Sequence, residues 1–395
     1  MNLASLAPQA ALPSPSTAVW QLGPVPIRAY ALCIVLGIVV AAVVTEARLR
    51  RRGVAPGATL DIAVWAVPFG IIGARLYHVI SSPQAYFGAD GHPLNAFKIW
   101  EGGLGIWGAI VGGALGAWLA VRQLGLPLSV VADALAPGLP LAQAIGRLGN
   151  WFNNELYGGP TTLPWGLQIH RMDPDNPGHA LRDGAGNPVL EPALYHPTFL
   201  YELVWNLGVA ALVYLVDRRV KFGRGRAFAL YVMAYTAGRF WIEMMRRDEA
   251  NIILGLRLNV WTSVLVFLGA LIYFLRVRGP REYVVPVTPP APAEPAGDIS
   301  RTDVSRPTAA AAPTGYRVVS EAEFRTYQET GELPAGPAGG DGADPAPAAD
   351  AAPVSAESGE DEPDEADEDE AADGPDRADR ARAAAPAPRS ADRDS

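Results

Sequence analysis

Long apolar segments separated by short polar connections run through the first 280 residues of the chain. Seven of them approach the length of about 20 residues that a helix needs to cross a bilayer. They cover about residues 27–47, 60–80, 103–121, 130–148, 197–216, 226–244 and 258–275. The fourth is the weakest, because Pro137 and Pro140 interrupt it. The pattern predicts an all-α polytopic membrane protein with seven transmembrane helices and excludes a soluble globular enzyme.

Glycines recur at three- and four-residue spacing along the third segment. They are Gly105, Gly108, Gly112, Gly113 and Gly116. This spacing places them on one helix face, and small residues there let two membrane helices approach closely.

The predicted seven-span domain covers residues 27–280 and includes a head, and two further regions lie outside it. Residues 150–196 are polar and rich in Pro and Gly, which predicts a small extracytoplasmic head. Residues 1–26 lack the basic start of a secretory signal and are expected to form a ragged extracytoplasmic segment. Residues 281–395 are Ala/Pro-rich and acidic, which predicts a disordered cytoplasmic tail with room for a short helix around residues 320–330.

Charge divides the chain at the same point. Residues 1–280 hold 22 Lys/Arg against 15 Asp/Glu, whereas residues 281–395 hold 10 against 26, so that the whole chain carries −9. The acidic balance argues against nucleic acid as a partner. One cysteine excludes a disulfide framework, and five scattered histidines show no zinc-site spacing. We therefore expect no metal and no cofactor.

The distribution of basic residues predicts the orientation in the membrane. The connections after the first, fifth and seventh segments are the most basic, with Arg48, Arg50, Arg51, Arg52, Arg218, Arg219, Lys221, Arg224, Arg276, Arg278 and Arg281. Cytoplasmic connections carry such an excess of Lys and Arg. Seven spans then place the N-terminus and the head outside and the C-terminus in the cytoplasm of a cell-membrane protein.

Ionisable residues within the spans are candidates for function, because a charge at the bilayer centre costs at least about 2.5–3.5 kcal/mol. The candidates are Arg75, Asp133, Arg147, Glu155, Glu202, Arg239 and Glu243. Pairing that merely holds helices together is an equally good interpretation for Arg75, Asp133 and Glu202.

The densest polar cluster lies at the outer end of the fourth segment. Arg147, Asn150, Asn153, Asn154 and Glu155 stand there among glycines. The guanidinium fork suits phosphate oxygens, asparagines add neutral donors, and glycines let a ligand approach the backbone. At headgroup depth, an anionic phospholipid headgroup is the natural ligand.

Three further motifs open or cross other segments. Arg239 and Glu243 are four residues apart, and hence on one face of the sixth helix. His196 to Glu202 opens the fifth segment, and Trp100 to Trp107 opens the third. Cys33 is expected to be a core residue, since a thiol in apolar surroundings is a poor nucleophile.

Together these segments resemble the prolipoprotein diacylglyceryl transferase family. Residues 146–158 match its signature, G-R-x-G-N-(F/W)-x-N-x-E-x-x-G. Tyr30, the segment from His196 to Glu202, and Arg239 with Glu243 also match, so that the resemblance covers about residues 20–278.

The resemblance implies transfer of the diacylglyceryl group of phosphatidylglycerol to the lipobox cysteine thiol of a prolipoprotein. Glycerol phosphate would leave and a thioether would form, with no metal required. Arg147 would bind the lipid phosphate, and Arg239 would contact the phosphate or the leaving group. Other roles implied are catalytic for Tyr30, orienting for Glu155 and Glu243, and substrate-binding for Asn150, Asn153 and Gly158.

One position departs from the family pattern, because Trp107 stands where many members have the histidine of an H-G-G motif. Two routes to the substrate thiolate remain open. In one, His196 acts as the base. In the other, which we favour, Arg147 and Arg239 with a donor such as Tyr30 hold the thiolate without an imidazole.

Two other functions are compatible with buried arginines and proline-broken spans. One is transport of an anionic solute or lipid, which would favour a two-fold repeat in the sequence that is not seen. The other is a lipid-binding scaffold without catalysis.

Overall fold

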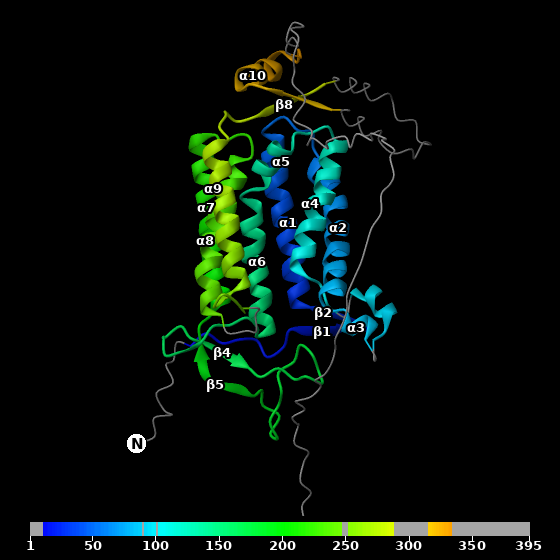
Figure 1. The fold of residues 1–395 in the computed structure, drawn as a ribbon, viewed down its shortest axis with the longest axis vertical. Coiled ribbons are helices and arrows are strands. Elements are labelled where there is room, and N and C mark those ends of the chain that lie inside the picture. The colour runs from blue at the N-terminus through cyan, green and yellow to red at the C-terminus, as the bar shows by residue number, and fades with distance from the viewer. Residues whose placement is uncertain (1–10, 89–90, 100–101, 247–251, 288–314, 334–395) are drawn as a thin grey trace, which may run out of the picture. The chain divides into compact units, whose positions relative to one another are not determined.

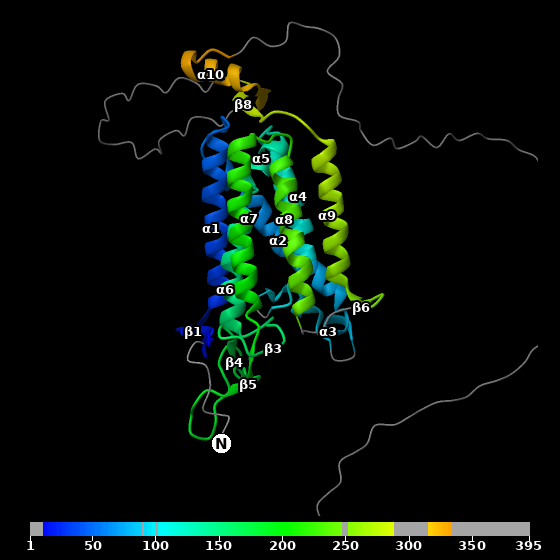
Figure 2. The ribbon, with the colours of Figure 1, turned by 90° about the vertical axis from the view of Figure 1, so that its left-hand side faces the viewer.

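The computed structural model describes residues 11–88, 91–99, 102–246, 252–287 and 315–333, all of which lie in one compact unit, Met1–Gly336. Seven helices lie side by side in it (Figures 1 and 2). They are α1 (Ala29–Arg50), α2 (Ala58–Ser81), α4 (Ile106–Gln123), α6 (Gly138–Asn153), α7 (Thr198–Val220), α8 (Arg226–Met245) and α9 (Leu258–Arg276). Short elements in the connections are α3 (Gln84–Phe87), η2 (Pro93–Phe97) and α5 (Leu128–Leu135).

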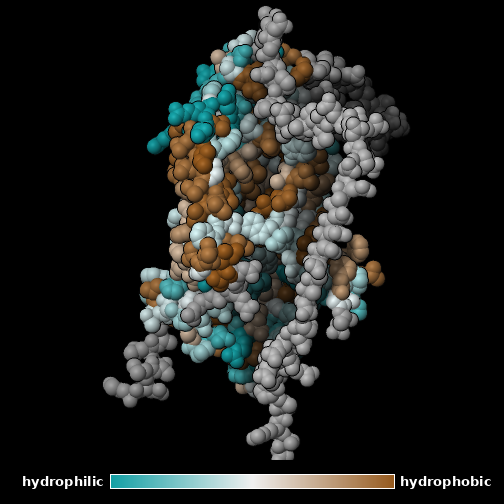
Figure 3. Space-filling view, viewed as in Figure 1, coloured by the Kyte–Doolittle hydropathy of each residue, from teal (hydrophilic) through white to brown (hydrophobic). Residues whose placement is uncertain are grey.

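The helices confirm a multi-pass membrane protein. Four of them, α1, α2, α7 and α9, are long and apolar enough to cross a membrane by themselves. The predicted fourth span is two helices, α5 and α6, which meet at a 44° bend and together can form a fifth crossing. Pro137 stands at that bend, as the prolines of this segment suggested. Apolar surface gathers over the helical part between more polar ends (Figure 3).

The glycine stripe packs against α2, as predicted. A Cβ atom added to Gly108 would lie 2.0 Å from the carbonyl oxygen of Gly73, and one added to Gly112 would lie 2.2 Å from that of Phe69. Real Cβ atoms do not approach a backbone this closely, so only glycine fits at these positions. The backbones of α2 and α4 are therefore in direct contact.

The predicted head is a three-stranded antiparallel sheet in the order β3-β5-β4, formed by Pro160–Thr161, Leu190–Tyr195 and Leu167–His170. The N-terminal segment is not ragged from residue 11 onward, which corrects the sequence-based expectation. Leu12 pairs with Leu167 of the head, and β1 (Val19–Leu22) forms an antiparallel pair with β2 (Val25–Arg28) just before α1. A second short pair, β6 (Ile252–Ile253) and β7 (Leu256–Arg257), precedes α9.

Part of the predicted disordered tail is folded, which is a second correction. β8 (Tyr283–Pro286) pairs antiparallel with β9 (Tyr316–Val319), which was not expected. The helix α10 (Glu321–Thr330) follows with a capping box at its start, where the sequence allowed for a short helix. Val284 is fully buried and its N–H donates to the Arg52 carbonyl at 2.8 Å, so the pair docks onto the turn after α1. Residues 288–314 and 334–395, with the acidic run, lie outside the described residues.

Candidate functional site

Local sequence places the polar cluster at the end of α6. The helix ends where Asn154 adopts a left-handed conformation, with φ of 54°, which asparagine tolerates better than most residues. The Asn154 side chain then contacts the N-terminal segment and the head, since Oδ1 accepts from the His170 N–H at 2.9 Å and Nδ2 donates to the Pro15 carbonyl at 2.8 Å. The end of α6 is thereby fixed against the head.

Arg147 and Arg239 share one carboxylate. Glu202 on α7 places Oε2 2.5 Å from Arg147 Nε and Oε1 3.4 Å from Arg239 Nη1. Three helices, α6, α7 and α8, therefore meet at Glu202, which is 5% exposed. Glu202, for which pairing and function are equally good interpretations of the sequence, lies between the two arginines that are predicted to bind phosphate.

Glu243 organises the other side of Arg239. Its Oε2 lies 2.5 Å from Arg239 Nη2, and its Oε1 accepts from Arg257 Nε at 2.8 Å and from Asn259 Nδ2 at 3.1 Å. Arg246 Nη1 is 3.6 Å from the same carboxylate. The predicted orienting role of Glu243 toward Arg239 is consistent with this geometry, whereas Arg246, Arg257 and Asn259 were not anticipated.

Asn150 connects Glu155 to Arg147. Its Oδ1 accepts from Arg147 Nη1 at 3.2 Å, and its Nδ2 donates to Glu155 Oε1 at 2.8 Å. Asn153 Nδ2 lies 3.3 Å from the same carboxylate oxygen. Glu155 thus acts on Arg147 through an amide rather than by direct contact.

Tyr30, at the start of α1, lies against this cluster. A Cβ atom on Gly149 would lie 2.4 Å from Tyr30 Cδ2, so the signature glycine makes room for the aromatic ring. The Tyr30 hydroxyl interacts with the Asn150 side chain and with the charges of Arg147 and Glu155. The Tyr235 side chain of α8 also forms a hydrogen bond with Arg147.

His196 and Gly158 are joined to each other. The Gly158 N–H donates to the His196 carbonyl at 2.9 Å, and a Cβ atom on Gly158 would lie 2.8 Å from His196 Cβ. The imidazole Nδ1 is 3.2 Å from the Tyr201 hydroxyl. Within the described residues, no ion pair or hydrogen bond links the His196 side chain to Arg147 or Arg239.

Two of the undecided ionisable residues have structural roles. Asp133 is fully buried and accepts from the N–H groups of Gly225, Ala227 and Phe228, so it caps the start of α8. Arg75 donates to backbone carbonyls in the connection between α2 and α4, which are those of Asn95, Ala96, Lys98, Gly102 and Gly103. In the described ranges, the hydrogen bonds and ion pairs of both residues lead to groups other than Arg147, Arg239 and Glu202.

A small cavity lies beside Arg239. This cavity of about 10 Å³, room for a single water molecule, is bordered by Glu202, Arg239, Asn206, Tyr235 and neighbouring residues. Asn206 is 2% exposed, and no residue that the structure describes donates a hydrogen bond to its Oδ1. Among the described residues, no group of three or more His, Cys, Asp or Glu could hold a metal ion.

Comparison with known proteins identifies the family. The sequence profile described as prolipoprotein diacylglyceryl transferase matches residues 17–276. The chain belongs to this family. A phosphatidylglycerol–prolipoprotein diacylglyceryl transferase of Frankia alni is 62% identical over 271 residues, which are 69% of this chain and 68% of the relative. Relatives with the same name in Frankia casuarinae and Streptomyces griseus are 57% and 54% identical, over 69% and 74% of this chain and 63% and 85% of their own lengths.

The family match covers all of the helices from α1 to α9, and it ends before β8. The resemblance found in the sequence is therefore confirmed as family membership. Trp107, the departure from the family motif, lies in the first turn of α4 and is 37% exposed. An indole has no basic nitrogen, so Trp107 cannot act as a base.

Proposed function

We propose that the chain transfers the diacylglyceryl group of phosphatidylglycerol to the lipobox cysteine thiol of prolipoproteins. The substrate sulfur would bond to the glyceryl carbon as the bond from that carbon to the phosphate oxygen breaks, and glycerol phosphate would leave. The observation that carries the proposal is the shared carboxylate of Glu202, which holds Arg147 and Arg239 together at the head end of the helices.

This arrangement suits a reaction that develops charge on a phosphate. Two guanidinium groups from different helices converge on one point, and each supplies a fork of N–H donors. Their side chains are 20% and 17% exposed, so water screens them less than it would at the surface. Donors held in advance where charge develops are commonly the largest single contribution to catalysis.

The carboxylate of Glu202 holds two guanidinium groups together, and each has further N–H donors that do not contact it. The cavity of about 10 Å³ beside Arg239 is too small for a headgroup, so binding there would require the side chains around it to move. We propose that the lipid phosphate binds the remaining donors of Arg147 and Arg239 while Glu202 keeps the two arginines in place.

The position of His196 supports the route without an imidazole base. Its ring nitrogen contacts Tyr201, whereas Tyr30 lies against Asn150 beside Arg147. Arg147 and Arg239 would favour the thiolate form of the substrate, with Tyr30 as a donor near it. The thiol proton would then be released to solvent rather than to His196.

Seven crossings with the head outside are also part of the proposal. Four helices cross by length and composition, and the bent pair α5 and α6 would be a fifth crossing. The helices α4 and α8 would supply two more, and α8 carries the charges of the site along one face. The basic ends of α1 and α7 would then face the cytoplasm.

Transfer of labelled lipid to a lipobox peptide in detergent tests the proposal. Arg147→Ala should abolish transfer, and Arg147→Lys should lose most of it, because a point charge cannot reproduce a bidentate fork. Arg171→Lys is the matched control, since Arg171 forms an exposed pair with Glu191 at 3.1 Å on the head. Near-normal turnover by either Arg147 variant would place the phosphate elsewhere.

A further inference from the structure

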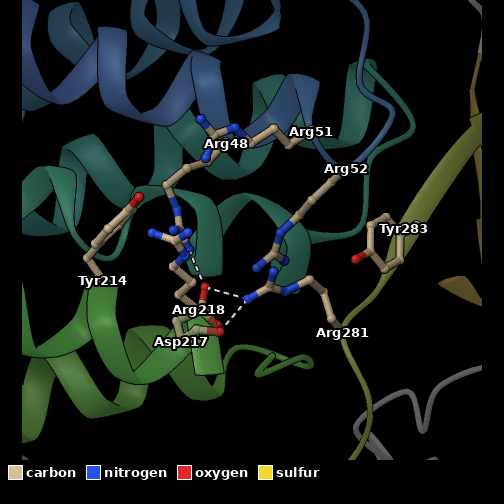
Figure 4. Close-up of a pocket in the computed structure, with 8 residues that line it drawn as sticks. All are labelled: Arg48, Arg51, Arg52, Tyr214, Asp217, Arg218, Arg281 and Tyr283. Carbon is tan, nitrogen blue, oxygen red and sulfur yellow. Dashed lines mark hydrogen bonds and ion pairs between the residues drawn. The ribbon is translucent and has the colours of Figure 1, made fainter. Parts of the chain in front are cut away.

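A second basic site lies at the opposite end of the helices from Arg147. It is a pocket of about 450 Å³, where the ends of α1 and α7 meet the segment after α9. Figure 4 shows the lining residues, which are Arg48, Arg51, Arg52, Tyr214, Asp217, Arg218, Arg281 and Tyr283. Five arginines thus surround a pocket that contains one carboxylate.

That carboxylate is already engaged. Asp217 is 1% exposed, and its Oδ2 lies 2.7 Å from Arg48 Nη2 and 2.8 Å from Arg281 Nη2. Its Oδ1 accepts from the Phe222 N–H at 3.1 Å. Asp217 can therefore offset only part of the positive charge of the pocket.

Arg52 is buried with unsatisfied donors. It is 3% exposed, and within the part of the chain that the structure describes neither Nη1 nor Nη2 has a hydrogen-bond partner. The nearest carboxylate, Asp133, is 3.8 Å from Nη1 and already accepts three N–H groups at the start of α8. Burial lowers the pKa of the Arg52 guanidinium. Arg281 Nε is likewise buried with no hydrogen-bond partner among the described residues.

Buried donors of this kind are costly unless a ligand satisfies them. Arginine forks from three separate segments match the oxygens of a phosphate, and the pocket is as large as typical small-molecule sites. We propose that this pocket binds a phosphate group, carried either by an anionic lipid headgroup or by a small molecule in solution. The site is separate from the transferase site and independent of its chemistry.

The experiment uses the full-length protein, delipidated in a neutral detergent, with Arg147→Ala in every sample to prevent turnover. The two probes are phosphatidylglycerol, counted by native mass spectrometry, and inorganic phosphate, followed by thermal unfolding at constant ionic strength. Arg51→Gln/Arg218→Gln removes two exposed lining charges, with little risk to folding. Arg50→Gln/Arg219→Gln is the matched control, because these exposed arginines are the sequence neighbours and do not line the pocket.

We expect the Arg51→Gln/Arg218→Gln variant to bind its probe about 30-fold more weakly, since each cation near an anionic headgroup is worth about fivefold in affinity. The control should stay within about twofold. A loss confined to phosphatidylglycerol identifies a lipid headgroup as the source, and a loss for inorganic phosphate identifies a ligand in solution. Arg52→Gln should weaken the binding of the same probe.

Two results would overturn the proposal. One is that, for each of the two probes, the control, the Arg51→Gln/Arg218→Gln variant and Arg52→Gln all bind with the same affinity. The other is binding that appears only when residues 334–395 are deleted, because the acidic tail of the chain would then be the occupant.

Discussion

Replacing Glu202 by Gln separates two roles of the site, because it keeps the shape of the side chain and removes its charge. In the structure this carboxylate lies 2.5 Å from Arg147 and 3.4 Å from Arg239. An amide can accept a hydrogen bond from one guanidinium, but it cannot hold both by charge. Both arginines then remain available to phosphate and lose their common anchor.

The expected effect is on kcat rather than on KM. Removing a single donor from an oxyanion site costs about 10²–10³ in rate. Here the donors stay and only their placement is lost, so we expect a decrease of about 10² in kcat, or about 2.7 kcal/mol of transition-state stabilisation. The KM for phosphatidylglycerol should not rise, since the variant has one more uncompensated positive charge beside an anionic substrate.

Steady-state transfer of labelled lipid to a lipobox peptide gives both constants. Glu191→Gln is the matched control, because it breaks an exposed pair with Arg171 and should change neither constant. A Glu202→Gln enzyme with a normal kcat would refute the positioning role, whether its KM is unchanged or tenfold higher. Thermal unfolding of each variant shows whether the loss comes from the site or from folding.

Three other predictions follow from the fold. His196→Gln should keep at least about a tenth of the transfer rate at saturating lipid, and a correctly folded variant slowed by about 10²–10⁴ would return the role of base to the imidazole. Deletion after Leu333 should leave the transfer rate and the melting temperature unchanged. Deletion after Val287 should lower the melting temperature, because it removes β9 and α10 and uncovers the buried valines of β8, whose burial is worth about 1.5–3 kcal/mol each. Equal melting temperatures for the two deletions would show that the docking adds no stability. A reporter fused after Leu333 should be active only in the cytoplasm and one fused near Gly178 only outside, and the reverse pattern would invert the proposed orientation.

Most of the helical architecture could be predicted from the sequence, because apolar length and glycine spacing are local properties. The glycine spacing of the third segment predicted a close approach to another helix, which the contact between Gly108 and Gly73 confirms. The pairing of β8 with β9 could not be predicted. Each strand has only four residues, and the segment between them has the composition of a linker.

The candidate site was predicted where its residues lie close in sequence. Arg147, Asn150 and Glu155 stand within nine residues, so their type and spacing already suggested an anion site. The partner of a buried charge depends instead on which helices meet. Glu202 and Asp133 look alike in the sequence, but one bridges two arginines and the other caps a helix.

The contact between α2 and α4 restricts how a lipid can reach the site. Their backbones touch along the glycine stripe, with no layer of side chains that could rotate aside. An acyl chain therefore cannot pass between these two helices where their backbones touch, and we expect α2 and α4 to move together. A substrate with two acyl chains therefore has to enter from the bilayer between another pair of helices, where side chains rather than backbones are in contact.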